Sequence, residues 1–124
     1  MKLDDRGHVT ALDSDEIIVV GTNAYGEHYG GAARQAHKDF GLKWGVREGL
    51  SGQAYAFPTL SKKTLPYSYS MLRSGRDTLY WVARKNPDKT FLLTPVGTGI
   101  AGMDKELIAE LFEKLAPNIK KVGW

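Results

Sequence analysis

The sequence predicts an α/β domain with three layers (α/β/α), in which helices cover both faces of a mixed, largely parallel sheet. Segments with the pattern of strands alternate along the chain with helical segments, which is typical of this class. Residues 16–20 read Glu-Ile-Ile-Val-Val, and such a continuously apolar, β-branched run indicates a strand buried on both faces. With 124 residues, the chain has the length of a single domain spanning residues 1–124.

The N-terminal third is expected to contain two strands and a helix. Residues 1–15 are polar and hold one candidate edge strand at residues 8–12. After the buried strand, a glycine-rich loop over residues 21–31 leads into a helix at residues 31–40, whose alanines allow it to lie close to the sheet. Gly41 is the natural residue to end that helix, because helices often terminate in a left-handed residue.

The middle of the chain is expected to be mostly extended and irregular. Residues 42–45 form a short extended piece, and residues 47–53 form a loop. Residues 54–57 alternate small and aromatic side chains, the period-two pattern of a strand, which Pro58 and Thr59 close. Two tryptophans are expected in the core, namely Trp44 and Trp81.

The C-terminal half is expected to contain two helices around one more strand. A helix over residues 67–85 carries Gly75 near its middle, where a break is allowed since glycine costs about 1 kcal/mol relative to alanine. The apolar residues 91–93 form a strand, a helix covers residues 104–115, and residues 116–124 are a tail or an edge strand. The apolar stripe of the last helix is Leu107, Ile108, Leu111, Phe112 and Leu115.

Composition limits the class of protein. A net charge of +3 with scattered basic residues does not favour a nucleic-acid surface and suits a small anionic ligand better. The chain has no cysteine and three histidines, so neither a metal site nor a cofactor is expected. No apolar run approaches 18 residues and the first residues are charged, so we expect no membrane span, no signal peptide and a cytoplasmic protein.

A second glycine-rich loop follows the apolar residues 91–93 and precedes the last helix; it comprises Gly97, Thr98, Gly99, Ile100, Ala101 and Gly102. Strand, glycine loop and helix N-terminus together can hold a phosphate through backbone N–H groups. The loop matches G-x-G-x-x-G, but the acidic residue that a dinucleotide fold needs about 20 residues later is missing. Met103 and Asp104 stand where an ATP-binding P-loop needs Lys and Ser/Thr. The remaining alternatives are a backbone cradle for an anion and an ordinary strand-to-helix turn.

Both glycine-rich loops leave the carboxyl ends of predicted strands. In open α/β sheets, ligands bind outside these ends. If the two strands are parallel neighbours, the loops face each other across one cleft. The two loops together then support an anion site more strongly than either loop does alone.

Three segments resemble macro domains, the modules that bind ADP-ribose and related nucleotides. The segment VVGTNAYGEHYGGAARQA resembles the strand, asparagine-containing turn, glycine loop and helix of that family. The segment TPVGTGIAGM resembles its phosphate-binding loop. A compact subfamily of phage and bacterial proteins is similar in its middle strand to EGLSGQAYAFPTL. The resemblance spans roughly residues 16–115 and implies a macro domain-like fold.

The resemblance implies a set of ligand-binding residues. Asn23 would hydrogen-bond the distal ribose, Gly30 to Ala32 would approach the ribose and pyrophosphate, and Thr98 to Ala101 would wrap the phosphates. In macro domains an early Asp reads the adenine amino group, and His8 stands near its place in this sequence. The expected ligand is therefore ADP-ribose or another phosphorylated ribonucleotide. The full expected set is Gly21, Thr22, Asn23, Tyr29, Gly30, Gly31, Ala32, Thr59, Gly97, Thr98, Gly99, Ile100, Ala101 and Gly102.

The candidates for catalysis lie in the first loop. Glu27 and His28 are its acid–base groups, and a hydrolase for an ADP-ribosyl or phosphate linkage would use one of them with Asn23 and a water. Each has a structural alternative, since Asn23 can cap its own turn and His28 can be an exposed loop histidine.

Two further classes of function remain open. A non-catalytic protein that sequesters a nucleotide would need only the cleft. A nucleic-acid accessory protein would instead use surface residues such as Lys62, Lys63, Lys120 and Lys121, and a structural or assembly protein would leave the cleft empty.

Overall fold

The computed structural model describes residues 1–61 and 65–124, and its centre is a five-stranded sheet. Across the sheet the strands are β4 (Gly49–Ser51), β5 (Ala54–Leu60), β3 (Glu16–Asn23), β6 (Thr90–Leu93) and β7 (Ile119–Lys121). All neighbours are parallel except β4 and β5, which are antiparallel. The expected mixed, largely parallel sheet is therefore confirmed.

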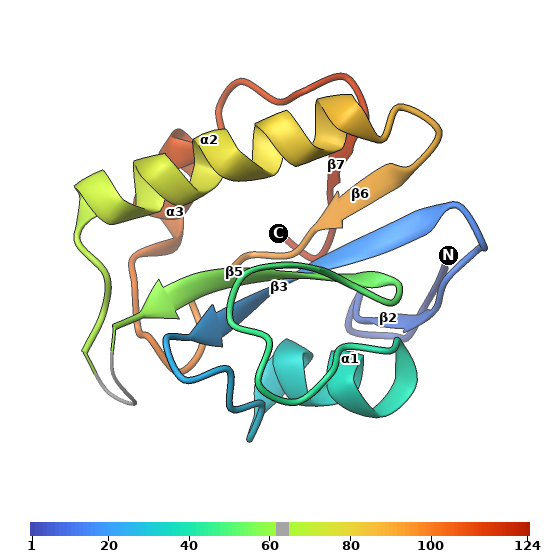
Figure 1. Cartoon of the computed structure of the whole chain (residues 1–124), viewed down its shortest axis with the longest axis horizontal. Helices are drawn as coiled ribbons and strands as arrows, with labels where there is room; N and C mark the ends of the chain where they lie inside the picture. The colour runs from blue at the N-terminus through green and yellow to red at the C-terminus, as the bar shows by residue number, and fades with distance from the viewer. Residues whose placement is uncertain (62–64) are drawn as a thin grey trace.

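Helices cover both faces of this sheet, as expected (Figure 1). Helix α1 (Gly31–Asp39) covers one face, and helices α2 (Tyr69–Lys85) and α3 (Lys105–Leu111) cover the other. Strand β3 serves both layers, because Val19 packs with α2 and α3 while Val20 packs with α1. None of the helices in the described part of the chain is long and apolar enough to cross a membrane.

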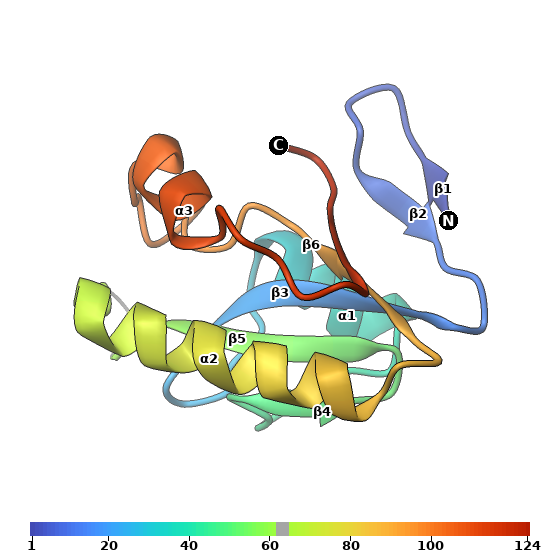
Figure 2. The ribbon, with the colours of Figure 1, turned by 90° about the horizontal axis from the view of Figure 1, so that it is seen from above.

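The N-terminus forms a hairpin apart from the sheet. Strands β1 (Lys2–Leu3) and β2 (Val9–Ala11) pair antiparallel with each other, and Figure 2 shows them beside the C-terminal tail. The carbonyl oxygen of Gly7 in the hairpin turn lies 3.6 Å from where a Cβ on Gly123 would stand. The candidate edge strand at residues 8–12 is thus β2, but it pairs with β1 and not with the five-stranded sheet.

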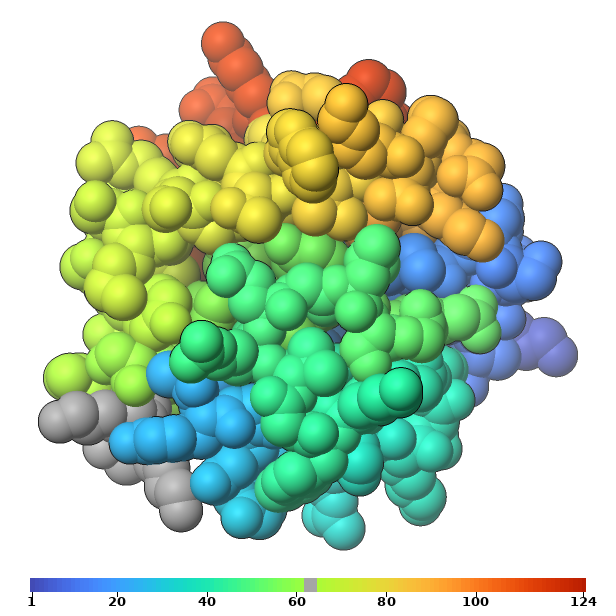
Figure 3. Space-filling view, in the orientation of Figure 1, coloured from blue at the N-terminus to red at the C-terminus, as the bar shows by residue number. Residues whose placement is uncertain are grey.

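Three expectations for the middle of the chain are wrong. Residues 42–45 form no strand, while the expected loop contains β4, which together with the preceding loop fills the surface between α1 and α2 (Figure 3). Pro58 does not close β5 but lies within it. Because β4 pairs only with residues 54–56, β5 has no neighbour on that side at Pro58, and the missing proline N–H costs no ladder hydrogen bond there.

Helices α1 and α2 end where the sequence indicates, whereas helix α3 is shorter than expected. Gly41 follows the C-cap of α1 with φ +82°. Helix α2 runs unbroken through Gly75. A Cβ at this residue would lie 3.4 Å from the ring of Phe57, so glycine allows the helix to pack closely on β5. Helix α3 ends at Leu111, so Leu115 lies beyond it and is 37% exposed.

Three further side chains expected in the core are exposed. Leu107 is on the solvent side of α3, because the short helix buries only Ile108 and Leu111. Trp81 lies on the outer face of α2 under the ammonium group of Lys85. The exposed Trp44 packs edge-on against Tyr29, His28 and His37 on the surface beside α1.

Candidate functional site

A cavity of about 690 Å³ lies at the carboxyl ends of β3, β5 and β6. The two glycine-rich loops form its facing walls, as the parallel arrangement of β3 and β6 requires. The turn of the N-terminal hairpin and the C-terminal tail complete it. The volume is in the range of small-molecule sites, about 300–1,000 Å³.

Of the residues expected to bind a ligand, all but Gly102 line this cavity. Those that line it are Gly21, Thr22, Asn23, Tyr29, Gly30, Gly31, Ala32, Thr59, Gly97, Thr98, Gly99, Ile100 and Ala101. Gly102 instead closes the loop, since its N–H donates to the Gly99 carbonyl at 2.9 Å.

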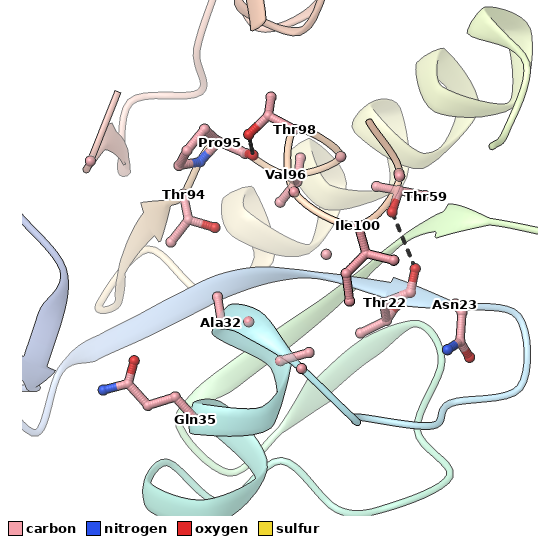
Figure 4. A pocket seen from close by; sticks show the side chains of 18 of the residues that line it. Thr22, Asn23, Ala32, Gln35, Thr59, Thr94, Pro95, Val96, Thr98 and Ile100 are labelled. Atoms are coloured by element: carbon pink, nitrogen blue, oxygen red, sulfur yellow. Dashed lines mark hydrogen bonds between the residues drawn. The ribbon is translucent and has the colours of Figure 1, made fainter. Parts of the chain in front are cut away.

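The floor of the cavity depends on a close approach between β3 and the loop after β6. A Cβ on Gly21 would lie 3.4 Å from the backbone nitrogen of Gly97 and 3.6 Å from Oγ1 of Thr59. Thr59 Oγ1 donates to the carbonyl oxygen of Thr22 at 3.3 Å, which ties β5 to β3 at the same place (Figure 4). A side chain at residue 21 would therefore project into the base of the cleft.

The loop after β6 is held by its own hydrogen bonds. Thr94 Oγ1 donates to the Val19 carbonyl at 2.6 Å, and Thr98 Oγ1 donates to the Pro95 carbonyl at 2.6 Å (Figure 4). The Met103 N–H donates to the Gly97 carbonyl at 2.8 Å, and the backbone of Gly97 has φ +79°. These contacts fix the loop in place without using the N–H groups of Gly99, Ile100 and Ala101.

Those N–H groups are available to a ligand. Among the described residues, the N–H groups of Gly99, Ile100 and Ala101 donate to no acceptor of the protein. The first N–H groups of α1, at Gly31 and Ala32, also lack intrahelical partners, because every helix leaves its first turn unpaired. The helix dipole adds partial positive charge at the same end. Both walls of the cavity thus contain backbone N–H groups that the described fold does not use.

The cleft is narrow where these walls meet. A Cβ on Gly30 would lie 3.3 Å from Cδ1 of Ile100, whose side chain is 73% exposed and reaches across from the opposite loop. No lysine or arginine is among the described lining residues, so positive potential in the cleft comes from backbone dipoles. The described residues also contain no group of three or more histidines and carboxylates able to hold a metal ion.

The amide of Asn23 is used within its own turn. Its Oδ1 accepts from the N–H groups of Tyr25 (3.0 Å) and Glu27 (3.2 Å), and its Nδ2 donates to the Glu27 carbonyl (3.0 Å). Asn23 therefore holds the backbone of Glu27, and both residues line the cavity.

The expectation that His28 is an exposed loop histidine is wrong. Its side chain is 1% exposed and does not line the cavity. Its Nε2 lies 2.9 Å from the Val46 carbonyl, and because a carbonyl oxygen only accepts, Nε2 is the donor in this contact. His28 anchors the loop before β4 through Val46.

The end of the cavity next to the hairpin contains residues that were not in the expected ligand-binding set. They include Val9, Gln35, Val122 and Gly123. Trp124 holds this end of the chain, since its indole Nε1 donates to the Leu93 carbonyl at 2.8 Å. The hairpin, α1 and the tail are distant in sequence, and only the folded topology brings these residues together.

Of the four lysines of the nucleic-acid alternative, the two that the structure describes do not line the cavity. Lys62 and Lys63 lie outside the described residues. Lys121 lies with its ammonium group 4.8 Å from the centre of the Trp124 ring, and Lys120 is the residue before it on β7.

Comparisons with known proteins agree with the fold. No protein-family model matches the sequence, and no curated protein matches it. Among solved structures, the chain is similar to the macrodomain of Mycobacterium tuberculosis DarG, with a TM-score of 0.67 and 21% sequence identity. The match covers 94% of this chain and 93% of that one. The similarity therefore extends over nearly the whole chain, which has a macro domain-like fold.

Proposed function

We propose that the cleft binds ADP-ribose or a closely related nucleotide, with the pyrophosphate between the two glycine-rich loops. The observation that carries this proposal is the pair of facing walls with unpaired N–H groups, at Gly99 to Ala101 and at the start of α1. Backbone donors at a helix N-terminus bind phosphate oxygens well. The macro domain-like fold and the resemblance of both loops to that family support the same ligand.

The two ends of the cavity differ in a way that suits an asymmetric nucleotide. Asn23, Glu27 and Tyr29 make one end polar, which suits ribose hydroxyl groups. Val9 and Val122, both nearly buried, make the other end apolar, which suits the faces of a base. A base, a pyrophosphate and a second ribose would occupy the apolar end, the middle and the polar end in that order.

A thermal-shift experiment tests the proposal. A ligand at 100 times its dissociation constant raises the free energy of unfolding by about 2.7 kcal/mol. The entropy of unfolding is about 0.26 kcal/mol/K for 124 residues, so the melting temperature should rise by about 10 °C. ADP-ribose should give this shift, and AMP and ribose 5-phosphate, which each lack the pyrophosphate, should give much less.

A matched pair of variants separates the cleft from the rest of the molecule. Gly30→Val would place its side chain against Ile100 in the narrowest part, and the backbone there, with φ −156°, accepts a β-branched residue. Ser70→Val adds similar bulk on the exposed side of α2. We expect the first to abolish the ligand shift and the second to keep it. If none of these compounds raises the melting temperature of the unmodified protein, the proposal is refuted.

A hydrolytic activity is a second candidate, favoured by the position of Glu27. Its carboxylate is in the wall at the polar end, and its backbone is fixed by Asn23. A water held there could attack an ADP-ribosyl or phosphate linkage while Glu27 accepts its proton. Glu27→Gln should then bind ADP-ribose 1″-phosphate but release no phosphate from it. Unchanged release by that variant would exclude Glu27 as the base, and no release by the unmodified protein would leave a nucleotide-sequestering role.

A further inference from the structure

We propose that Gln35 selects the base of the bound nucleotide, by accepting a hydrogen bond from an exocyclic amino group. This inference rests on the proposed function and adds to it a preference for a 6-aminopurine over a 6-oxopurine. Gln35 lies in α1 and lines the apolar end of the cavity.

The orientation of the Gln35 amide is fixed by the hairpin. Its Nε2 donates to the carbonyl oxygen of Val9 at 2.8 Å, so the amide oxygen Oε1 occupies the other edge of the group. Figure 4 shows the nitrogen turned toward the hairpin and the oxygen turned away from it. Rotating the amide by 180° would set Oε1 against the Val9 carbonyl, two acceptors in contact. The edge of the amide that faces away from the hairpin therefore carries an acceptor, and Gln35 lines the cavity.

The surroundings of Gln35 increase the effect of this acceptor. Val9 and Val122 are 4% and 6% exposed and give this end of the cavity apolar walls. A hydrogen bond in such a place is stronger than in water, and an acceptor that faces another acceptor is correspondingly costly. Discrimination between an amino and an oxo group is therefore larger here than at an exposed site.

The position along α1 also fits a base. Gln35 follows the phosphate-binding end of the helix at Gly31 by four residues, which corresponds to about 6 Å along the axis. One ribose spans a similar distance between a 5′-phosphate and its base. A nucleotide with its pyrophosphate at Gly31 would thus carry its base to Gln35.

His8 is the other polar side chain at this end, and it is less able to discriminate. Its side chain is 64% exposed, and its Nδ1 lies 3.8 Å from Oδ2 of Asp4. Water competes for an exposed imidazole, so we assign the selection to Gln35.

Calorimetric titration with two nucleotides tests the inference. Inosine diphosphate ribose differs from ADP-ribose by an oxygen in place of the 6-amino group, with a proton on N1. The unmodified protein should bind ADP-ribose at least about tenfold more tightly, the equivalent of about 1.4 kcal/mol. Gln35→Leu and Gln35→Met, which keep an apolar side chain of similar length, should bring the ratio of the two affinities close to one.

The ratio distinguishes selection from a structural role. If Gln35 only tied the hairpin to α1, its loss would weaken both nucleotides by the same factor and leave the ratio unchanged. An unchanged ratio in both variants, or equal affinities in the unmodified protein, would overturn the assignment while leaving the proposed function intact. Failure of both nucleotides to bind the unmodified protein would overturn the proposed function, and this inference with it.

Discussion

The loop after β6 offers a paired test of its geometry, because two of its glycines differ sharply in what an added methyl group would meet. At Gly97 the backbone has φ +79°, and a Cβ would lie 2.8 Å from the sulfur of Met103. At Gly99 the backbone is outside the left-handed region, and a Cβ would meet nothing within 4 Å. The same substitution should therefore have opposite outcomes two residues apart.

The size of the difference follows from these two positions. A left-handed conformation costs a non-glycine residue about 1–2 kcal/mol, and moving the Met103 side chain adds to it, so Gly97→Ala should lower the free energy of unfolding by about 2 kcal/mol. With an unfolding entropy of about 0.26 kcal/mol/K for 124 residues, the melting temperature should fall by about 8 °C. Gly99→Ala should change stability by less than about 1 kcal/mol, in the stabilising direction, because it restricts only the unfolded chain.

Thermal unfolding of both variants, followed by circular dichroism without ligand, measures this difference. Equal melting temperatures for the two variants would refute the loop conformation described here. So would a Gly99→Ala protein that is less stable than Gly97→Ala.

Three other predictions concern the supports of the cleft. Asn23→Ala removes the amide that fixes the following turn and should lower the free energy of unfolding by about 1–3 kcal/mol in urea titrations without ligand; an unchanged midpoint would contradict this role. Trp124→Phe removes one indole hydrogen bond to β6 and should lower the free energy of unfolding by about 0.5–1.5 kcal/mol, as measured by thermal unfolding. An unchanged stability would mean that the indole N–H is hydrogen-bonded to water and not to β6. The backbone N–H groups of His8 and Arg6 donate to the Asp4 carboxylate and hold the pKa of that carboxyl below its ordinary value of 3.8. The ionised carboxylate stabilises the hairpin above pH 3.8, and this stabilisation is lost as the pH falls through the lower pKa of the folded protein. An NMR titration of the His8 amide should therefore show a midpoint below 3.8. A midpoint at or above 3.8 would contradict the contact.

The central sheet could be predicted from the sequence because its main strands carry strong local signals. Residues of β3 and β6 are apolar on both faces, and in the structure both faces are covered by helices. Strand β4 gives no such signal. It has three residues, pairs with a single neighbour and exposes 45% of Leu50, so its existence depends on the adjacent β5 and not on its own composition.

The site could be predicted only where it depends on backbone. Glycines that follow buried strands mark the two loops, and these loops do face each other across the cavity. The surroundings of a side chain are set by partners far along the chain. His28 is buried by contact with residues 44–46, and Gln35 is oriented by Val9, 26 residues away. A local pattern contains neither relation.

The unpaired N–H groups of the cleft also explain which ligands it is suited to bind. An amide N–H without a partner costs about 1–3 kcal/mol when it is dry, so in the free protein these groups have to face water. Gly99 and Ile100 are exposed and meet this condition. A phosphate replaces that water without moving the donors, because internal hydrogen bonds already hold the loop. Selection then depends on the positions of acceptor oxygens more than on net charge, and affinity should fall far less between about 50 and 200 mM salt than for a protein that binds nucleic acid through lysines. A basic stripe and a P-loop lysine, both missing from this sequence, are features that such a site does not use.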